Sequence, residues 1–157
     1  MMIILAPFAP EYEIAKKRFG LYHEVILLGV GPRNAMETLL ELKLPRYANN
    51  LMLFGFAGSN TLPMDTEVFV TESYLHQFHG SYDDKPCILR RPEIEGAPEI
   101  GVPCYSSSDF VVETKVKEPA IFDMELAFLT LFHPNITSWR IVSDNLNLQE
   151  FEDYYKK

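Results

Sequence analysis

The chain has 157 residues, of which 47% are hydrophobic and 13% aromatic. This is enough to bury one sizeable core but too little for two comfortable domains, so we expect a single domain over residues 1–157. With 22 acidic and 14 basic residues the formal net charge is −8. Because phosphate neutralisation dominates binding to nucleic acids, this composition argues against nucleic acid as a main partner. No run approaches the roughly 20 apolar residues of a membrane-spanning helix, so we expect no membrane partner.

The cysteines and histidines give no sign of a metal centre. Cys87 and Cys104 are the two cysteines, too few and too ordinary in spacing for a disulfide framework or a zinc site. The four histidines lack the spacing of metal ligands. We therefore expect no metal and no cofactor, and a reducing, cytoplasmic environment.

The N-terminal segment alternates between predicted strands and helices. Residues 2–6 are apolar and stop at Pro7 without a basic leader, which predicts a first strand rather than a signal peptide. Residues 11–19 contain helix formers and end at Gly20, so they predict a helix. Residues 24–28 predict the second strand.

The same alternation continues toward the middle of the chain. Residues 33–44 have apolar side chains near the helical period, and Pro45 ends this predicted helix. Residues 50–54 predict a third strand that enters a turn of small residues at 55–59. Residues 67–71 alternate polar and apolar side chains, which predicts a fourth strand.

The C-terminal half is less regular at first. Residues 77–103 are interrupted by proline, glycine and paired aspartates, and they show no clear period. Order returns at residues 105–111, and residues 148–155 predict a short terminal helix.

Two acids follow short apolar runs in this half, with a predicted helix at 126–132 between them. Because ligands bind at the carboxyl ends of strands in open α/β sheets, we expect Glu125 and Asp144 on one rim, where they could share a small polar substrate. A simpler interpretation is also open. Glu125 would then be the first-turn acid of the following helix, and Asp144 a cap for a turn.

Two glycine-containing segments could approach a ligand. The segment from Gly29 to Ala35 lies between a strand and a helix, where it could be a tight turn, a substrate-facing turn or a nicotinamide site. It is a poor dinucleotide motif, because Pro32 removes a backbone donor and Ala35 replaces the third glycine. Residues 55–60 either admit a substrate to the main chain or mark a bend.

Other candidates are weaker. The serines at 106–108 lack a nucleophile elbow or a visibly paired histidine. Phe110 and Met124 are either core residues or platforms for a heterocycle.

The motifs taken together resemble a known family. The order Gly-x-Gly-x-x-Asn-Ala, Gly-x-Ala-Gly, Ser-Asp-Phe, x-Met-Glu and Arg-x-x-Ser-Asp resembles the purine nucleoside phosphorylase and nucleosidase superfamily, most closely the methylthioadenosine/S-adenosylhomocysteine nucleosidases. The resemblance covers residues 2–74 and 105–145, and residues 123–125 and 140–144 are its most specific parts. It implies an α/β fold of three layers, a mixed central sheet flanked by helices.

The resemblance also implies roles for the C-terminal residues. Asp144 would be the general acid that protonates N7 of the purine, and Ser143 would orient it. Glu125 would accept hydrogen bonds from the ribose hydroxyls, with Met124 packed beneath the sugar. Phe110 would stack on the base.

Further roles follow from the same resemblance. The main chain of Val111 would contact the edge of the base, and Ala57 and Gly58 would lie against the substrate. Glu11, rather than Glu13, would activate the attacking water. Breaking an N-glycosidic bond leaves positive charge on the sugar and negative charge on the base, which explains carboxylates near one and an acid near the other.

Water or phosphate could be the nucleophile. Phosphorylases of the family present arginines to phosphate, one of them beside the glycines after the third strand, whereas residues 53–56 contain no basic side chain. Hydrolysis is favoured. Arg33, just after a glycine turn, keeps phosphorolysis as the alternative.

A non-catalytic relative that binds a nucleoside or a partner protein is the other alternative. Phe56 stands where nucleosidases usually have a small polar residue. The chain is shorter than the family between residues 74 and 105 and after Asp144, so sheet would be exposed. A second subunit could cover it, and we expect a homo-oligomer.

Overall fold

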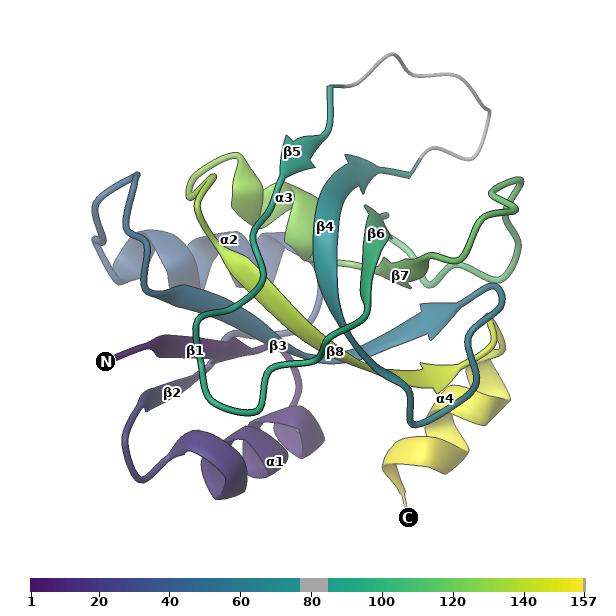
Figure 1. The fold of residues 1–157 in the computed structure, drawn as a ribbon, viewed down its shortest axis with the longest axis horizontal. Coiled ribbons are helices and arrows are strands. Elements are labelled where there is room, and N and C mark those ends of the chain that lie inside the picture. The colour runs from purple at the N-terminus through teal and green to yellow at the C-terminus, as the bar shows by residue number, and fades with distance from the viewer. Residues whose placement is uncertain (77–84, 157) are drawn as a thin grey trace.

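The computed structural model describes residues 1–76 and 85–156, which form a mixed sheet with helices on both faces (Figure 1). No helix in these two ranges is long and apolar enough to cross a membrane. The elements in chain order are β1 (Ile3–Ala6), α1 (Ala9–Phe19), β2 (Glu24–Leu27), α2 (Pro32–Glu41), β3 (Leu51–Ser59), β4 (Glu67–Leu75), β5 (Cys87–Ile88), β6 (Gly101–Ser106), β7 (Ile121–Asp123), α3 (Leu126–Thr130), β8 (Thr137–Asp144) and α4 (Leu148–Tyr155).

The strand order is β2-β1-β3-β7-β6-β4-β5, and β8 pairs with both β3 and β4. Strands β1, β2, β3 and β8 run parallel to one another, while β7 is antiparallel to β3 and β8 is antiparallel to β4. Strands β3, β7, β6, β4 and β8 therefore form a closed ring of pairings. The ring has β3 and β8 as its longest parallel pair.

Alternating side chains divide the core into two clusters, one on each face of the sheet. On β3, Leu51 and Leu53 join the cluster that contains Leu39 of α2, together with residues of α3. Met52 and Phe54 join the cluster with Phe19 of α1 and, at its edge, residues of α4. Figure 1 shows α2 and α3 above the sheet and α1 and α4 below it. The three-layer α/β prediction is confirmed.

The predicted turn at residues 55–59 is wrong. Those residues are the second half of β3, which is buried along its whole length and pairs with β8. Its glycines misled the prediction because small residues are typical of turns. Here they make room for side chains that cross the strand, and the only irregularity is a register shift between Ala57 and Gly58.

Other boundaries differ by a few residues. Helix α2 ends at Glu41, before Pro45, because Lys43 adopts a left-handed conformation with φ of 52°. Strand β6 begins at Gly101, inside the segment that showed no period, since its proline at position 103 and short length hide the alternation. Residues 77–84 of that segment lie outside the described residues.

The strands that precede Glu125 and Asp144 run in opposite directions. Strand β8 is parallel to β3, but β7 is antiparallel to it and meets only its last two residues, Gly58 and Ser59. The two acids still approach the same region, because the short β7 crosses the carboxyl end of β3.

Candidate active site

A pocket of about 140 Å³ lies where the carboxyl ends of β3 and β8 meet the start of α1, the β7–α3 junction and α4. Eight of the nine residues predicted as site residues line it. They are Glu11, Ala57, Gly58, Phe110, Met124, Glu125, Ser143 and Asp144. The ninth, Val111, lines an adjoining recess of about 30 Å³ that shares Gly58, Phe110, Met124 and Asp144 with the pocket.

The Asp144 carboxyl is held at the end of β8, where its residue is 1% exposed. Its Oδ1 accepts a hydrogen bond from the Ser143 hydroxyl at 2.8 Å, and its Oδ2 accepts one from the Leu146 N–H at 3.0 Å. Burial raises the pKa of Asp144, while these hydrogen bonds lower it. A Cβ at Gly58 would lie 2.9 Å from Oδ2, so a glycine is needed for this close approach.

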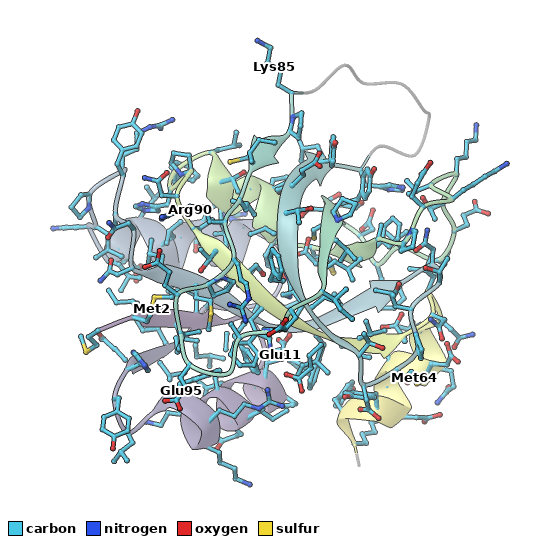
Figure 2. All side chains as sticks on the ribbon, in the orientation of Figure 1. Met2, Glu11, Met64, Lys85, Arg90 and Glu95 are labelled. Atoms are coloured by element: carbon cyan, nitrogen blue, oxygen red, sulfur yellow. The ribbon has the colours of Figure 1, made fainter. Side chains whose placement is uncertain are left out.

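The Glu11 carboxyl comes from the first turn of α1 and lies near the centre of the molecule (Figure 2). The residue is 4% exposed, and its Oε2 accepts a hydrogen bond from the Phe56 N–H on β3. Burial raises the pKa of Glu11 to about 8, opposed by the nearby Arg140 and reinforced by Glu125. Near neutral pH this carboxyl is therefore mostly protonated.

Glu125 sits at the junction of β7 and α3, where its Oε2 accepts a hydrogen bond from the Gly31 N–H at 2.9 Å. Gly31 has φ of 85°, a left-handed conformation that glycine adopts without strain. Burial raises the pKa of Glu125 to about 7, and the charge on Asp123 adds to the shift. The first glycine turn thus positions a carboxylate of the pocket.

A buried ion pair beneath these carboxylates was missed by the sequence analysis. Arg140 on β8 is fully buried, and its Nη1 donates to Asp123 Oδ2 at 2.6 Å. Its Nη2 donates to the Phe56 carbonyl at 2.8 Å, and the Ser106 hydroxyl donates to the other oxygen of Asp123. An arginine in a strand predicted to be buried was the available signal, because a buried guanidinium needs a carboxylate partner.

Aromatic side chains form one wall of the pocket. Phe110 packs against Phe151 of α4 with ring centroids 5.7 Å apart, and Phe8 lies 6.2 Å from the same ring. Phe56 lines the pocket and packs edge-to-face on Tyr154, at 5.2 Å. The sequence predicted helix α4 but not that its aromatic face closes the pocket.

In the described ranges, no group of three or more His, Cys, Asp or Glu side chains is arranged to hold a metal ion. No protein-family model matches the sequence, and no curated protein matches it significantly.

Solved structures do resemble the chain. Methylthioadenosine/S-adenosylhomocysteine nucleosidase of Helicobacter pylori is 15% identical, with a TM-score of 0.75 over 99% of this chain and 90% of that chain. Futalosine hydrolase of Helicobacter pylori is 14% identical, with a TM-score of 0.76 over 99% and 90%. The nucleosidase of Neisseria meningitidis, in complex with methylthio-immucillin-A, is 19% identical, with a TM-score of 0.68 over 99% and 91%.

The chain has the nucleoside phosphorylase/nucleosidase fold. In this nucleosidase fold the carboxyl ends of the parallel strands β3 and β8 carry Gly58 and Asp144, where α/β sheets generally bind ligands. The fold prediction made from the short motifs is therefore confirmed at full length.

In this nucleosidase fold, replacing Gly55 with alanine should displace the Glu11 carboxyl from its place against β3. A Cβ at Gly55 would lie 2.6 Å from Glu11 Cδ, so the carboxyl must move off the Phe56 N–H. We expect a loss of unfolding free energy of about 1–3 kcal/mol, the typical cost of overpacking a core. Chemical denaturation measures it.

The matched control is the same substitution in a Glu11→Ala background. With the carboxyl removed, the new methyl group has room, so Gly55→Ala should then cost much less. Equal costs in both backgrounds would contradict the assigned clash.

Proposed function

We propose that the chain is a purine nucleosidase, an enzyme that uses water to cleave the N-glycosidic bond of a purine nucleoside. The observation that carries the proposal is the gathering of Glu11, Phe110, Glu125 and Asp144 around one pocket, although they lie far apart in the sequence. The nucleosidase fold and the names of the similar structures support hydrolysis as the reaction class.

Asp144 acts on the base in this mechanism. Phe110 stacks on the purine, and the protonated Asp144 carboxyl donates its proton to N7 as the bond between C1′ and N9 breaks. Burial of Asp144 supports this role, because it raises the pKa of the carboxyl and favours the protonated form. Ser143 and the Leu146 N–H fix the orientation of the carboxyl.

Glu125 and Glu11 act on the sugar side. The Glu125 carboxylate accepts hydrogen bonds from the ribose hydroxyls and stabilises the positive charge that develops at C1′, while Met124 packs beneath the ring. The ionised form of Glu11, which is the minor form near neutral pH, takes a proton from water as the water oxygen bonds to C1′. The Phe56 N–H holds Glu11 in place.

Water is favoured over phosphate as the nucleophile. Among the residues that the structure describes, no lysine or arginine lines the pocket. Arg33 points elsewhere, with a side chain that is 90% exposed and an ion pair to Glu37 at 3.2 Å. Arg140 is already engaged by Asp123 and the Phe56 carbonyl. Phosphorolysis through Arg33 therefore has little support.

The aromatic wall favours a nucleoside with an apolar 5′ substituent, such as methylthioadenosine. Phe8, Phe56 and Phe151 present apolar rings, whose burial against an alkylthio group is favourable. Release of adenine or hypoxanthine from methylthioadenosine, adenosylhomocysteine, inosine and adenosine tests the proposal, with and without phosphate. We expect release that does not depend on phosphate. Absence of release from all four substrates would refute hydrolysis of these nucleosides.

Phe56 supports a second candidate, a relative that binds nucleosides without cleaving them. Its large ring lines the pocket where nucleosidases usually carry a small polar residue, and it leaves a volume of only about 140 Å³. Calorimetry that shows saturable purine binding, with an intact glycosidic bond after long incubation, would favour this candidate over the enzyme.

A homo-oligomer is part of the same proposal. Val30 lines the pocket and is 46% exposed, and Leu27 and Leu40 nearby in the sequence are 49% and 58% exposed. Apolar exposure beside a pocket favours cover by a second subunit. Light scattering that gives the mass of one chain at micromolar concentration would refute it.

The raised pKa of Glu11 predicts how stability depends on pH. The folded-state pKa of about 8 exceeds the ordinary value of 4.5, so the folded chain binds more protons than the unfolded chain between those pH values. The contribution of Glu11 to the unfolding free energy should therefore be fully present below about pH 4.5 and be lost as the pH rises through 8. Each unit of pKa difference corresponds to about 1.4 kcal/mol, so the fall is on the order of a few kcal/mol.

The matched variant is Glu11→Gln, which has no proton to lose. Urea unfolding at several pH values should give a flatter curve for it than for the natural chain. Some slope remains, because the pKa of Glu125 is also raised, to about 7. Identical slopes of unfolding free energy against pH in the two proteins would contradict the prediction that Glu11 is buried and protonated.

A further inference from the structure

A second recess lies at the opposite end of the sheet from Asp144. It has a volume of about 240 Å³ and is lined by residues at or just before the first residues of four strands: Met2 before β1, His23 before β2, Asn50 before β3 and Thr137 at the start of β8. Because these strands are parallel, the recess is at their amino ends and the proposed nucleoside pocket is at the carboxyl ends of β3 and β8. The two hollows share no lining residue.

Two neighbouring arginines line this recess. Arg91 is fixed, because its Nε donates to the Pro98 carbonyl at 2.7 Å and its Nη2 donates to the Ala97 carbonyl at 2.5 Å. Arg90 makes no hydrogen bond within the described ranges, and its only ion pair is to Glu93 at 3.8 Å, which is longer than a hydrogen bond. Figure 2 shows Arg90 and Met2 on the same side of the molecule. The guanidinium of Arg90 is therefore available to a ligand.

Neutral donors accompany the arginines. Nδ1 of His23 lies 3.0 Å from the Met2 N–H and accepts its hydrogen bond. The neutral ring then carries its proton on Nε2, which leaves an N–H donor. Asn49 also lines the recess, and its side-chain amide makes no hydrogen bond to the described residues.

The charge of the recess is opposite to that of the whole chain. The formal net charge is −8, yet two arginines and one acid, Glu93, line this hollow. The Glu93 side chain is 88% exposed, so it can turn toward solvent when an anion enters. A guanidinium fork matches the geometry of oxyanions, so Arg90, together with the part of the Arg91 guanidinium that the two carbonyls leave free, favours an anion with several oxygens.

We propose that this recess binds a small molecule that carries a phosphate group, through Arg90, Arg91 and His23. A phosphate offers three or more acceptor oxygens, enough for all three side chains, whereas a carboxylate offers two. The proposal is independent of the nucleosidase reaction, because it concerns a separate hollow that contains none of the catalytic groups.

Calorimetry on the full chain at low ionic strength tests the proposal, with inorganic phosphate as the probe and acetate as the carboxylate comparison. We expect saturable phosphate binding and no comparable acetate binding. Arg90→Gln should weaken phosphate binding about tenfold, the effect of losing one charge-assisted hydrogen bond. Arg33→Gln is the matched control, since Arg33 is an exposed arginine paired with an acid outside both hollows, and it should bind phosphate like the natural chain.

The location is tested separately. On addition of phosphate, the His23 ring resonances should shift in NMR spectra, and the Asp144→Asn variant should bind phosphate unchanged. No saturable binding, equal binding by Arg90→Gln and Arg33→Gln, or loss of binding in Asp144→Asn would each overturn the proposal. None of these results depends on turnover, so a failure here is distinguishable from a failure of the proposed hydrolysis.

Discussion

Replacing Asp144 with asparagine should lower the rate of nucleoside cleavage by about 10²- to 10⁴-fold, the contribution typical of a general acid. Nucleoside binding should change much less, because the side chain keeps its size. An asparagine fits the existing contacts when its oxygen faces the Leu146 N–H and its NH₂ faces the Ser143 hydroxyl. Ser143 can then donate to the Ala57 carbonyl, 3.4 Å away.

Two controls separate acid catalysis from damage to the fold. Asp109→Asn makes the same chemical change at an exposed aspartate one residue before Phe110, and it should leave the rate unchanged. A riboside with a nitrophenol leaving group needs little protonation, so Asp144→Asn should cleave it nearly as fast as the natural chain does. Equal losses on the nucleoside and on the nitrophenyl riboside would contradict the assignment of Asp144 as the acid.

Several elements could be predicted from local features of the sequence. Helix α4 was predicted at its observed bounds, and α1 differs by two residues at its start. The β7–α3–β8 order was also correct. Strands β7 and β8 are wholly buried and α1 buries one face, so in these segments the local pattern and the tertiary structure favour the same state.

The glycine-rich half of β3 could not be predicted this way. Gly55 and Gly58 look like turn residues, but each is small because a carboxyl group from another element occupies the space of its Cβ. Glu11 lies against the first and Asp144 against the second. Each glycine is thus required by a contact with a distant residue, 44 positions away for Gly55 and 86 for Gly58. A local sequence pattern carries no information about such contacts.

The site residues also divide into those that the sequence could predict and those that it could not. Residues in short motifs, such as Glu125 and Asp144, were predicted to share a site, and the structure places both at the pocket. Phe8 and Phe151 also line it, but aromatic residues near the chain ends are ordinary in sequence and only packing brings them together. The ion pair of Arg140 with Asp123 was visible only as an unexplained charge in a strand predicted to be buried.

That ion pair carries the largest expected effect on stability. Replacing Arg140 with methionine should lower the unfolding free energy by about 3–5 kcal/mol, because it leaves the Asp123 carboxylate buried without its partner. The Phe56 carbonyl also loses the hydrogen bond from Nη2. Since Arg140 lowers the pKa of Glu11, the variant should raise that pKa further and reduce the ionised fraction available as a base.

Chemical denaturation of three variants tests this assignment. Arg18→Met removes an ion pair with the same 2.6 Å separation, to Glu67, but with both side chains 35% exposed, so it should cost about 1 kcal/mol or less. Asp123→Asn combined with Arg140→Met removes both buried charges and keeps an oxygen to accept from the Leu126 N–H. This double variant should be more stable than Arg140→Met alone, because the cost of the single change is mainly the unpaired carboxylate rather than the lost attraction. If the double variant were instead the less stable of the two, the attraction between the charges, and not the burial of one of them, would dominate the energetics of this core.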